Sequence, residues 1–145
     1  MVYVPFLAGQ LLTAELLNER LVEETMAWTA IDDIGNFATN YSAHANTPML
    51  RKIRLLGQER WEYKGRISIV AGSLTANVDH TIFTFDPGYR PTAEHGWSVC
   101  SASSDFFPVR LTLQVAGTLK AGVPTEAGNN ANAILLDGMY IDAPI

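Results

Sequence analysis

The chain has 145 residues, of which 48% are hydrophobic and 17% charged, a composition typical of a folded domain and not of a disordered or collagen-like chain. Its formal net charge of −5 argues against nucleic-acid binding driven by phosphate neutralisation. A single cysteine, Cys100, cannot form an internal disulfide, and no apolar run approaches the ~20 residues that span a bilayer. The length predicts one domain, or one domain with an appended helix.

The charges are unevenly distributed along the chain. Residues 1–35 hold six acidic side chains and one basic one, whereas residues 51–66 hold six basic and two acidic ones. Solvated faces of alternate sign are the simplest explanation of such a pattern. The alternative is that the two regions attract each other during assembly, either within one chain or between copies.

Residues 13–35 have the pattern of an amphipathic helix. Thr13 can cap the first turn through its hydroxyl, and Gly35 can end the helix. Apolar side chains recur at steps near 3.6 residues and fall on one side, so we expect this helix to pack against something. The apolar stripe consists of Leu17, Leu21, Trp28 and Ile31.

A polar segment, residues 36–49, follows the predicted helix and reads as a linker. From residue 50 onward the pattern is β, and the clearest strand is residues 107–116, where apolar and polar side chains alternate. Residues 120–132 read as a loop because Gly, Pro and Asn are frequent there. Further strands are predicted at residues 51–56, 60–63, 66–71, 80–85, 96–102, 133–136 and 138–142.

Short strands with no helical pattern between them indicate a mainly β fold. Turn residues separate the strands throughout this region. The pattern predicts an N-terminal helix followed by an antiparallel β-sandwich of jelly-roll type.

Several stretches carry a resemblance to phage proteins. Residues 6–18, FLAGQLLTAELLN, resemble the opening of many bacteriophage tail-fibre and minor tail proteins. The turn DPGYRP at residues 86–91 is similar to a turn in the trimeric heads of phage receptor-binding and tail-fibre proteins. A late strand within 111–117, followed by two terminal strands within 133–140, resembles the end of such heads. The resemblance covers most of the chain.

The resemblance implies a structural virion protein, a short homotrimeric tail fibre or minor tail protein assembled in the host cytoplasm. Residues 1–49 would attach it to tail or capsid proteins and trimerise it through the apolar stripe. Residues 50–145 would form a β-sandwich head that binds a glycan or protein on the host surface. Two alternatives stay open: a capsid decoration or head-fibre protein without a receptor role, and a stand-alone carbohydrate-binding or hydrolytic domain.

The sequence contains no recognisable catalytic constellation. His44, His80 and His95 are isolated, and motifs for a nucleophile elbow, a phosphate-binding loop or a dinucleotide site are absent. Cys100 in a predicted strand is most simply a small buried hydrophobic side chain. We therefore expect no enzyme activity, cofactor or metal, no nucleic-acid partner and no membrane insertion.

Candidates for receptor contact are aromatic and polar side chains near turns. Trp97 and Phe106 flank turns, and Asp105 ends the polar run SASSD, so these three side chains are candidates for stacking on a sugar or hydrogen bonding to it, or for contact with a host protein. In the turn at residues 86–91 we interpret Tyr89 as a packed lid on a rigid loop. Ligand contact by Tyr89 or Arg90 is the alternative.

Overall fold

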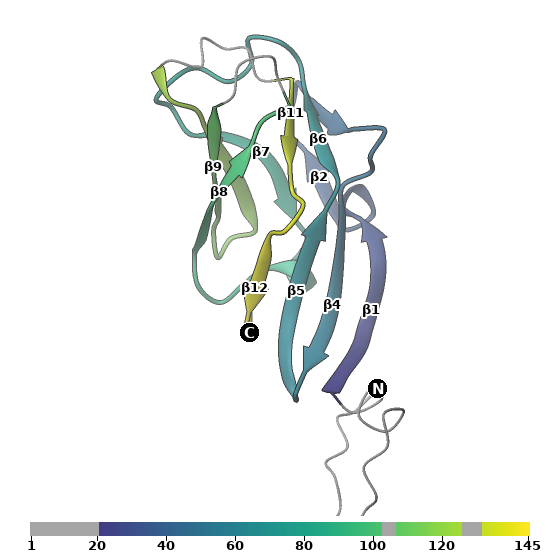
Figure 1. The fold of residues 1–145 in the computed structure, drawn as a ribbon. Helices are drawn as coiled ribbons and strands as arrows, with labels where there is room; N and C mark the ends of the chain where they lie inside the picture. Colours follow the sequence, from purple (N-terminus) through teal and green to yellow (C-terminus); the bar gives the residue numbers. More distant parts are fainter. Residues whose placement is uncertain (1–20, 103–106, 126–131) are drawn as a thin grey trace, which may run out of the picture.

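The computed structural model describes residues 21–102, 107–125 and 132–145, and these form two layers of β-strands (Figure 1). Two 3-10 turns, η1 (Ile31–Asp33) and η2 (Pro87–Tyr89), interrupt the strands. No helix in this part of the chain is long and apolar enough to cross a bilayer. The strands are β1 (Val22–Ala30), β2 (Gly35–Phe37), β3 (Tyr41–Ala43), β4 (Met49–Leu55), β5 (Gln58–Lys64), β6 (Arg66–Ile69), β7 (His80–Phe85), β8 (His95–Cys100), β9 (Pro108–Leu113), β10 (Thr118–Gly122), β11 (Ala133–Leu135) and β12 (Tyr140–Asp142).

Three antiparallel sheets make up the two layers. One layer contains the four-stranded sheet β1-β4-β5-β12 and the three-stranded sheet β11-β6-β3, which meet because β5 continues into β6 after the single residue Gly65 (Figure 1). Gly65 has a φ of +87°, and a Cβ there would overlap the backbone of Thr47, so this junction requires glycine. The other layer is the five-stranded sheet β2-β7-β10-β9-β8.

The hydrophobic core lies between the layers and is built by strand alternation. In β9 the buried Val109, Leu111 and Leu113 alternate with the outward-facing Pro108 and Arg110. Aromatic rings from both layers meet in this core, among them Tyr63 of β5 and Phe85 of β7, whose ring centres lie 6.3 Å apart. The largest fully buried side chains are Trp61, Phe83, Phe85, Ile31, Leu50, Ile67, Leu74, Ile82, Leu111, Leu113, Ile134 and Leu136.

The predicted mainly β architecture with antiparallel pairing is confirmed. Each of the eight strands that alternation predicts overlaps an observed strand, and β7 has the predicted bounds. The described strands form sheets of four, three and five strands, which differs from the two sheets of an eight-stranded jelly roll.

The predicted helix over residues 13–35 is wrong for residues 22–35. Residues 22–30 form β1, which pairs with β4, and residues 31–37 form η1 and β2. Two register shifts interrupt β1, between Glu24 and Met26 and between Met26 and Thr29, so its side chains do not alternate with a period of two. Pairing with β4 therefore overrides a local pattern that favours a helix. Residues 13–20 lie outside the described residues.

The predicted apolar stripe is divided between different surroundings. Ile31 is fully buried in the core, so its side chain is not available for an interface between copies. Trp28 and Leu21 are half-buried on β1 and just before it. Leu17 lies outside the described residues. The trimeric role of Leu21 and Trp28 stays a prediction.

The boundary predicted between residues 49 and 50 does not separate two packed units in the described chain. β1, β2 and β3 pair with β4, β7 and β6, respectively, and Ile31 and Ile34 belong to the common core. The predicted linker thus contains strands, which are only three residues long and give little periodic signal. The loop predicted from residue 120 is also wrong at its start, because β10 runs through Gly122 in the middle of the five-stranded sheet.

Candidate functional site

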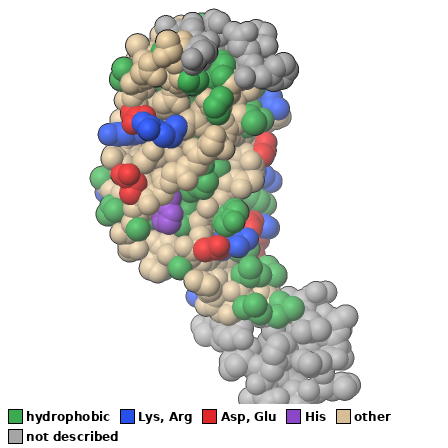
Figure 2. Space-filling model, turned by 60° about the vertical axis from the view of Figure 1, so that its left-hand side comes forward, with side chains coloured by type: hydrophobic (Ala, Val, Ile, Leu, Met, Phe, Trp, Pro, Cys, Tyr) green, Lys and Arg blue, Asp and Glu red, His purple; other side chains and the backbone are tan. Residues whose placement is uncertain are grey.

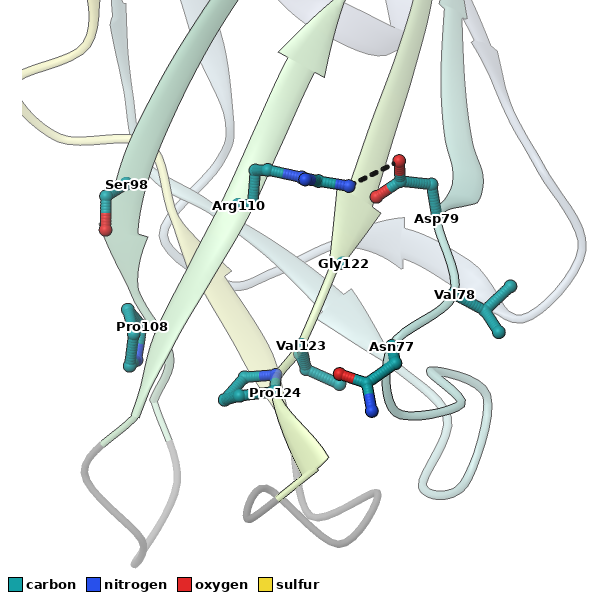
Figure 3. Close-up of a pocket in the computed structure, with 9 residues that line it drawn as sticks. All are labelled: Asn77, Val78, Asp79, Ser98, Pro108, Arg110, Gly122, Val123 and Pro124. Atoms are coloured by element: carbon teal, nitrogen blue, oxygen red, sulfur yellow. Dashed lines mark hydrogen bonds and ion pairs between the residues drawn. The ribbon is translucent and has the colours of Figure 1, made fainter.

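A hollow of about 360 Å³ lies on the outer face of the five-stranded sheet (Figure 3). Its volume falls within the range of about 300–1,000 Å³ that is usual for small-ligand sites. Strands β8, β9 and β10 and the segment before β7 provide its walls. The lining residues are Asn77, Val78, Asp79, Ser98, Pro108, Arg110, Gly122, Val123 and Pro124.

Strand register aligns the polar side chains of the hollow in a row. Ser98 of β8 pairs with Arg110 of β9, and Arg110 pairs in turn with Gly122 of β10. Asp79 immediately precedes β7, the strand on the other side of β10. Figure 3 shows the Arg110 side chain extending across the Gly122 position towards Asp79.

Arg110 and Asp79 form an exposed ion pair above Gly122. Arg110 Nη2 donates a hydrogen bond to Asp79 Oδ2 over 2.7 Å, and this bond raises the pKa of Arg110. A Cβ at position 122 would lie 2.6 Å from Asp79 Oδ1. The absence of a side chain at Gly122 therefore leaves the space in which the two charged groups meet.

The wall formed by Asn77 is fixed by hydrogen bonds to the segment after β10. Asn77 has a φ of +59°, in the left-handed region that asparagine tolerates better than most residues. Its backbone N–H donates to the carbonyl oxygen of Val123 over 2.8 Å, and its side-chain amide donates to the hydroxyl oxygen of Thr125. The hollow thus has a preorganised amide at one side and apolar side chains at its rim.

The hollow offers hydrogen-bonding groups of every type. Arg110 and the Asn77 amide donate, the Asp79 carboxylate accepts, and the Ser98 hydroxyl can do both. Within the described residues no group of three or more His, Cys, Asp and Glu side chains is arranged to hold a metal ion. The arrangement is suited to holding a hydroxylated ligand by hydrogen bonds.

Tyr89 packs against the core, as its interpretation as a lid expects. Its ring is half-buried against the core, and Lys52 Nζ donates to the carbonyl oxygen of Gly88 over 2.8 Å within the same turn. Burial lowers the pKa of Lys52, and the charge of Glu59 opposes this shift. Arg90 is also committed to the turn, because its Nε donates to the carbonyl oxygen of Phe85 over 2.9 Å. These contacts give both turn residues a structural role.

The other predicted receptor candidates lie apart from the hollow or outside the described residues. Trp97 lies within β8 rather than at a turn, and its ring packs 6.2 Å from that of Tyr63. Its Nε1–H donates to the carbonyl oxygen of Tyr140 over 3.2 Å, which joins the edge strands of the two layers. Asp105 and Phe106 are not among the described residues.

Charges on the four-stranded sheet are largely matched within the chain. Glu24 of β1 lies 3.7 Å from Arg51 of β4, whose guanidinium also pairs with Glu62 at 2.6 Å. Glu23 lies 3.5 Å from Arg54. The acidic and basic regions of the sequence therefore attract each other within one chain, which was one of the predicted alternatives.

Trp28 lies on the outer face of the same sheet beneath two basic side chains. Arg51 Cζ lies 4.8 Å and Lys64 Nζ 4.3 Å from the centre of its ring. A second hollow, of about 310 Å³, borders Trp28, Lys64 and Tyr140. Trp28 is thus held by cation–π contacts within its own chain.

The residues of the main hollow were not identified from the sequence. Alternation in the predicted strand at residues 107–116 indicates that Arg110 faces outward, which is the one available signal. Gly122 falls in a segment predicted to be a loop, and Asp79 lies 31 residues before Arg110. Their proximity depends on the pairing of β9 and β7 with β10, which periodicity does not reveal.

The described chain belongs to the class of antiparallel β-sandwiches, with a polar hollow on one outer face. Neither the protein-family models nor the curated proteins include a match to its sequence. Its structure is similar to the crystal structure of the receptor binding protein (gp15) of Listeria phage PSA, with a TM-score of 0.56 and 13% sequence identity. The match covers 90% of this chain and 70% of that chain. The protein therefore shares its fold with a phage receptor binding protein.

Proposed function

We propose that this protein is a structural component of a bacteriophage virion whose β head binds the surface of the host cell. The observation that carries the proposal is the fold shared with the phage receptor binding protein over 90% of the chain. The resemblance of residues 6–18 to tail-fibre and minor tail proteins supports the same role. Fold alone does not specify function, so a site is also required, and the hollow between Asn77 and Ser98 supplies a candidate.

In the finer proposal the protein is a short homotrimeric tail fibre or minor tail protein. The N-terminal segment attaches it to other virion proteins during assembly in the host cytoplasm, and the head is presented outward. Three copies of a weak site give avid binding, because linked contacts raise the apparent affinity by orders of magnitude. The protein acts by adhesion without catalysis, and it requires no cofactor.

A cell-binding experiment tests this proposal. A fluorescent protein fused after the exposed Ile145 leaves the N-terminal segment unaltered. The fusion is applied to a panel of bacteria that includes Listeria, the host named for the structural neighbour. We expect saturable labelling of at least one species, and competition by the unlabelled protein. The fluorescent protein alone is the control.

Absence of labelling on every species tested would contradict a receptor-binding role. If the protein nevertheless bound to purified phage particles, a capsid decoration or head-fibre protein would be the better description. Labelling that persisted on cells stripped of surface glycans would instead favour a host protein as the receptor.

A further inference from the structure

We infer that the hollow above Gly122 binds an uncharged saccharide unit through two neighbouring hydroxyl groups, and that it discriminates against acidic sugars. This inference rests on the proposed function and adds the chemical class of the ligand. The site is defined by the Arg110–Asp79 pair, with Ser98 and Asn77 on either side of it (Figure 3).

The first argument is the balance of charge in the hollow. Among the nine described residues that line it, Arg110 and Asp79 are the charged ones, and they neutralise each other at 2.7 Å. A carboxylate or phosphate would have to compete with Asp79 for the guanidinium and would meet the like charge of the Asp79 carboxylate. An uncharged ligand avoids both costs. On the face shown in Figure 2, acidic side chains lie beside basic ones within a mainly uncharged surface.

The second argument is the remaining hydrogen-bonding capacity of the ion pair. A guanidinium has five N–H donors and a carboxylate has about four acceptor sites, so the single bond between Arg110 Nη2 and Asp79 Oδ2 leaves most of them for a ligand. Both side chains are accessible, with 68% of Arg110 and 36% of Asp79 exposed. Each sugar hydroxyl can accept and donate, so one of two adjacent hydroxyls can accept from Arg110 while the other donates to Asp79.

The third argument is the shape and polarity of the surroundings. Gly122 provides a floor without a side chain, while Pro108 and Pro124 offer apolar surface at the rim for the C–H groups of a sugar ring. The fixed backbone of Asn77 and the strand position of Ser98 place further polar groups at the two ends. Few rotatable groups need to be ordered on binding, which reduces its entropic cost.

The experiment compares two sugars that differ only at one carbon. Methyl β-D-glucopyranoside and methyl β-D-glucuronide, together with the methyl galactoside and mannoside, are titrated at millimolar concentrations into the full-length ¹⁵N-labelled protein, and amide chemical shifts are followed. We expect saturable shifts at Ser98, Arg110 and Gly122 with at least one uncharged glycoside. The glucuronide should bind about tenfold more weakly than the glucoside or not at all, because the Asp79 carboxylate repels the carboxylate of the glucuronide.

Substitutions test whether the ion pair is responsible. Arg110→Gln should weaken glycoside binding by about tenfold, the usual consequence of losing a charge-assisted hydrogen bond. Asp79→Asn should weaken the uncharged glycosides and strengthen the glucuronide, because it leaves Arg110 as an unneutralised cation. The matched control is Arg60→Gln, which breaks another exposed pair, between Arg60 and Asp142 at 2.6 Å on the other layer. Exposed ion pairs contribute little to stability, so all three variants should fold.

Several outcomes would overturn the inference. These are no saturable shift with any uncharged glycoside, tighter binding of the glucuronide to the wild-type protein, or an equal effect of Arg110→Gln and Arg60→Gln. Cell labelling separates this failure from failure of the proposed function. If the wild-type protein labels cells and Arg110→Gln labels them equally well, the saccharide site alone is contradicted. If the wild-type protein binds glycosides but does not label cells, the receptor role alone is contradicted.

Discussion

Lys52 Nζ on β4 lies 4.6 Å from the centre of the Tyr89 ring, so a strand of one layer holds the turn that precedes β8 in the other. The same ammonium lies 4.8 Å from the ring centre of Trp61, which is buried in the core. One basic side chain therefore links the core, the turn and both layers. This contact explains why the most recognisable turn of the sequence has a structural role.

Substitution Lys52→Ala should lower the free energy of unfolding by about 1–2 kcal/mol, because two cation–π contacts and the packing of the lysine stem are lost. Urea denaturation followed by tryptophan fluorescence measures the change. A double-mutant cycle with Tyr89→Leu should give a coupling energy of about 0.5–1 kcal/mol. Additive effects of the two substitutions would show that the ammonium and the ring do not interact.

Two glycines provide a matched pair for testing packing. A Cβ at Gly35 would overlap the Thr84 carbonyl oxygen and the Phe83 ring, whereas a Cβ at Gly88 would meet open space. Gly35→Ala should therefore destabilise the protein by about 1–3 kcal/mol or more through overpacking, and Gly88→Ala should leave its stability nearly unchanged. Thermal unfolding of both variants measures the difference. Equal midpoints would contradict the close packing of β2 against β7.

Tyr63 should control the loss of stability at alkaline pH. Burial raises the pKa of its phenol well above the ordinary value of 10.0, and among the described residues its hydroxyl has no hydrogen-bond partner. The unfolded chain therefore loses this proton first, so the stability contribution is fully present below about pH 10 and declines as the pH rises above it. Tyr63→Phe should flatten the decline and raise stability at neutral pH by up to about 1 kcal/mol, since an unsatisfied hydroxyl is removed.

The control for this prediction is Tyr140→Phe, since Tyr140 is half exposed. Unfolding free energies of the wild-type protein and both variants are measured between neutral pH and pH 11 or so. An alkaline decline of the same slope in Tyr63→Phe and in the wild type would assign the titration to other groups.

Truncation distinguishes the observed packing from the boundary predicted from sequence. A chain that begins at Thr47 lacks β1, β2 and β3 and the buried Ile31 and Ile34, so we expect it to aggregate or remain unfolded. A chain that begins at Leu21 retains every described strand and should unfold cooperatively with a β-type circular dichroism spectrum. A soluble, cooperatively folded fragment from Thr47 would show that the first three strands are dispensable.

The trimer prediction can be tested with the residues of the apolar stripe that remain outside the core. Light scattering of the full-length protein should report about three times the chain mass of 15.9 kDa. Leu21→Asp should shift this mass towards that of the monomer, whereas Leu56→Asp, at a 64% exposed position in the turn between β4 and β5, serves as the control. A wild-type protein that is monomeric at micromolar concentration would contradict trimerisation.

The strands that the sequence predicts correctly are those with regular alternation or clear turn residues at both ends. β9 is an example of the first kind, because its buried and exposed positions follow the pleat. β7 is an example of the second kind, because it ends at the turn residues that begin with Asp86, although Ile82 and Phe83 are both buried. β1 is missed because two register shifts break the period, and β2 and β3 because three residues carry almost no periodic information. Tertiary pairing decides the conformation of these segments.

The candidate site is harder to predict than the strands for a related reason. The sequence indicates that Arg110 faces outward, but not which side chain lies next to it. Asp79 lies next to Arg110 because the strands are ordered β7-β10-β9. The role of Gly122, which leaves space between the two charged side chains, can be recognised only once both flanking strands are placed. The predicted candidate Trp97 illustrates the converse, because an aromatic side chain expected at a turn proves to pack between edge strands.

The alternation along β9 has a consequence for how such a protein could diversify. Arg110 faces solvent, while its neighbours Val109 and Leu111 are fully buried, so the proposed ligand binding and the folding of the sheet would depend on different side chains of one strand. Ser98, in the neighbouring edge strand β8, is similarly exposed between two half-buried residues. Under the proposed receptor role, selection by changing hosts would act on the outward positions of the sheet while the inward positions stay constant. Adaptation of this kind requires neither longer loops nor a rearranged core.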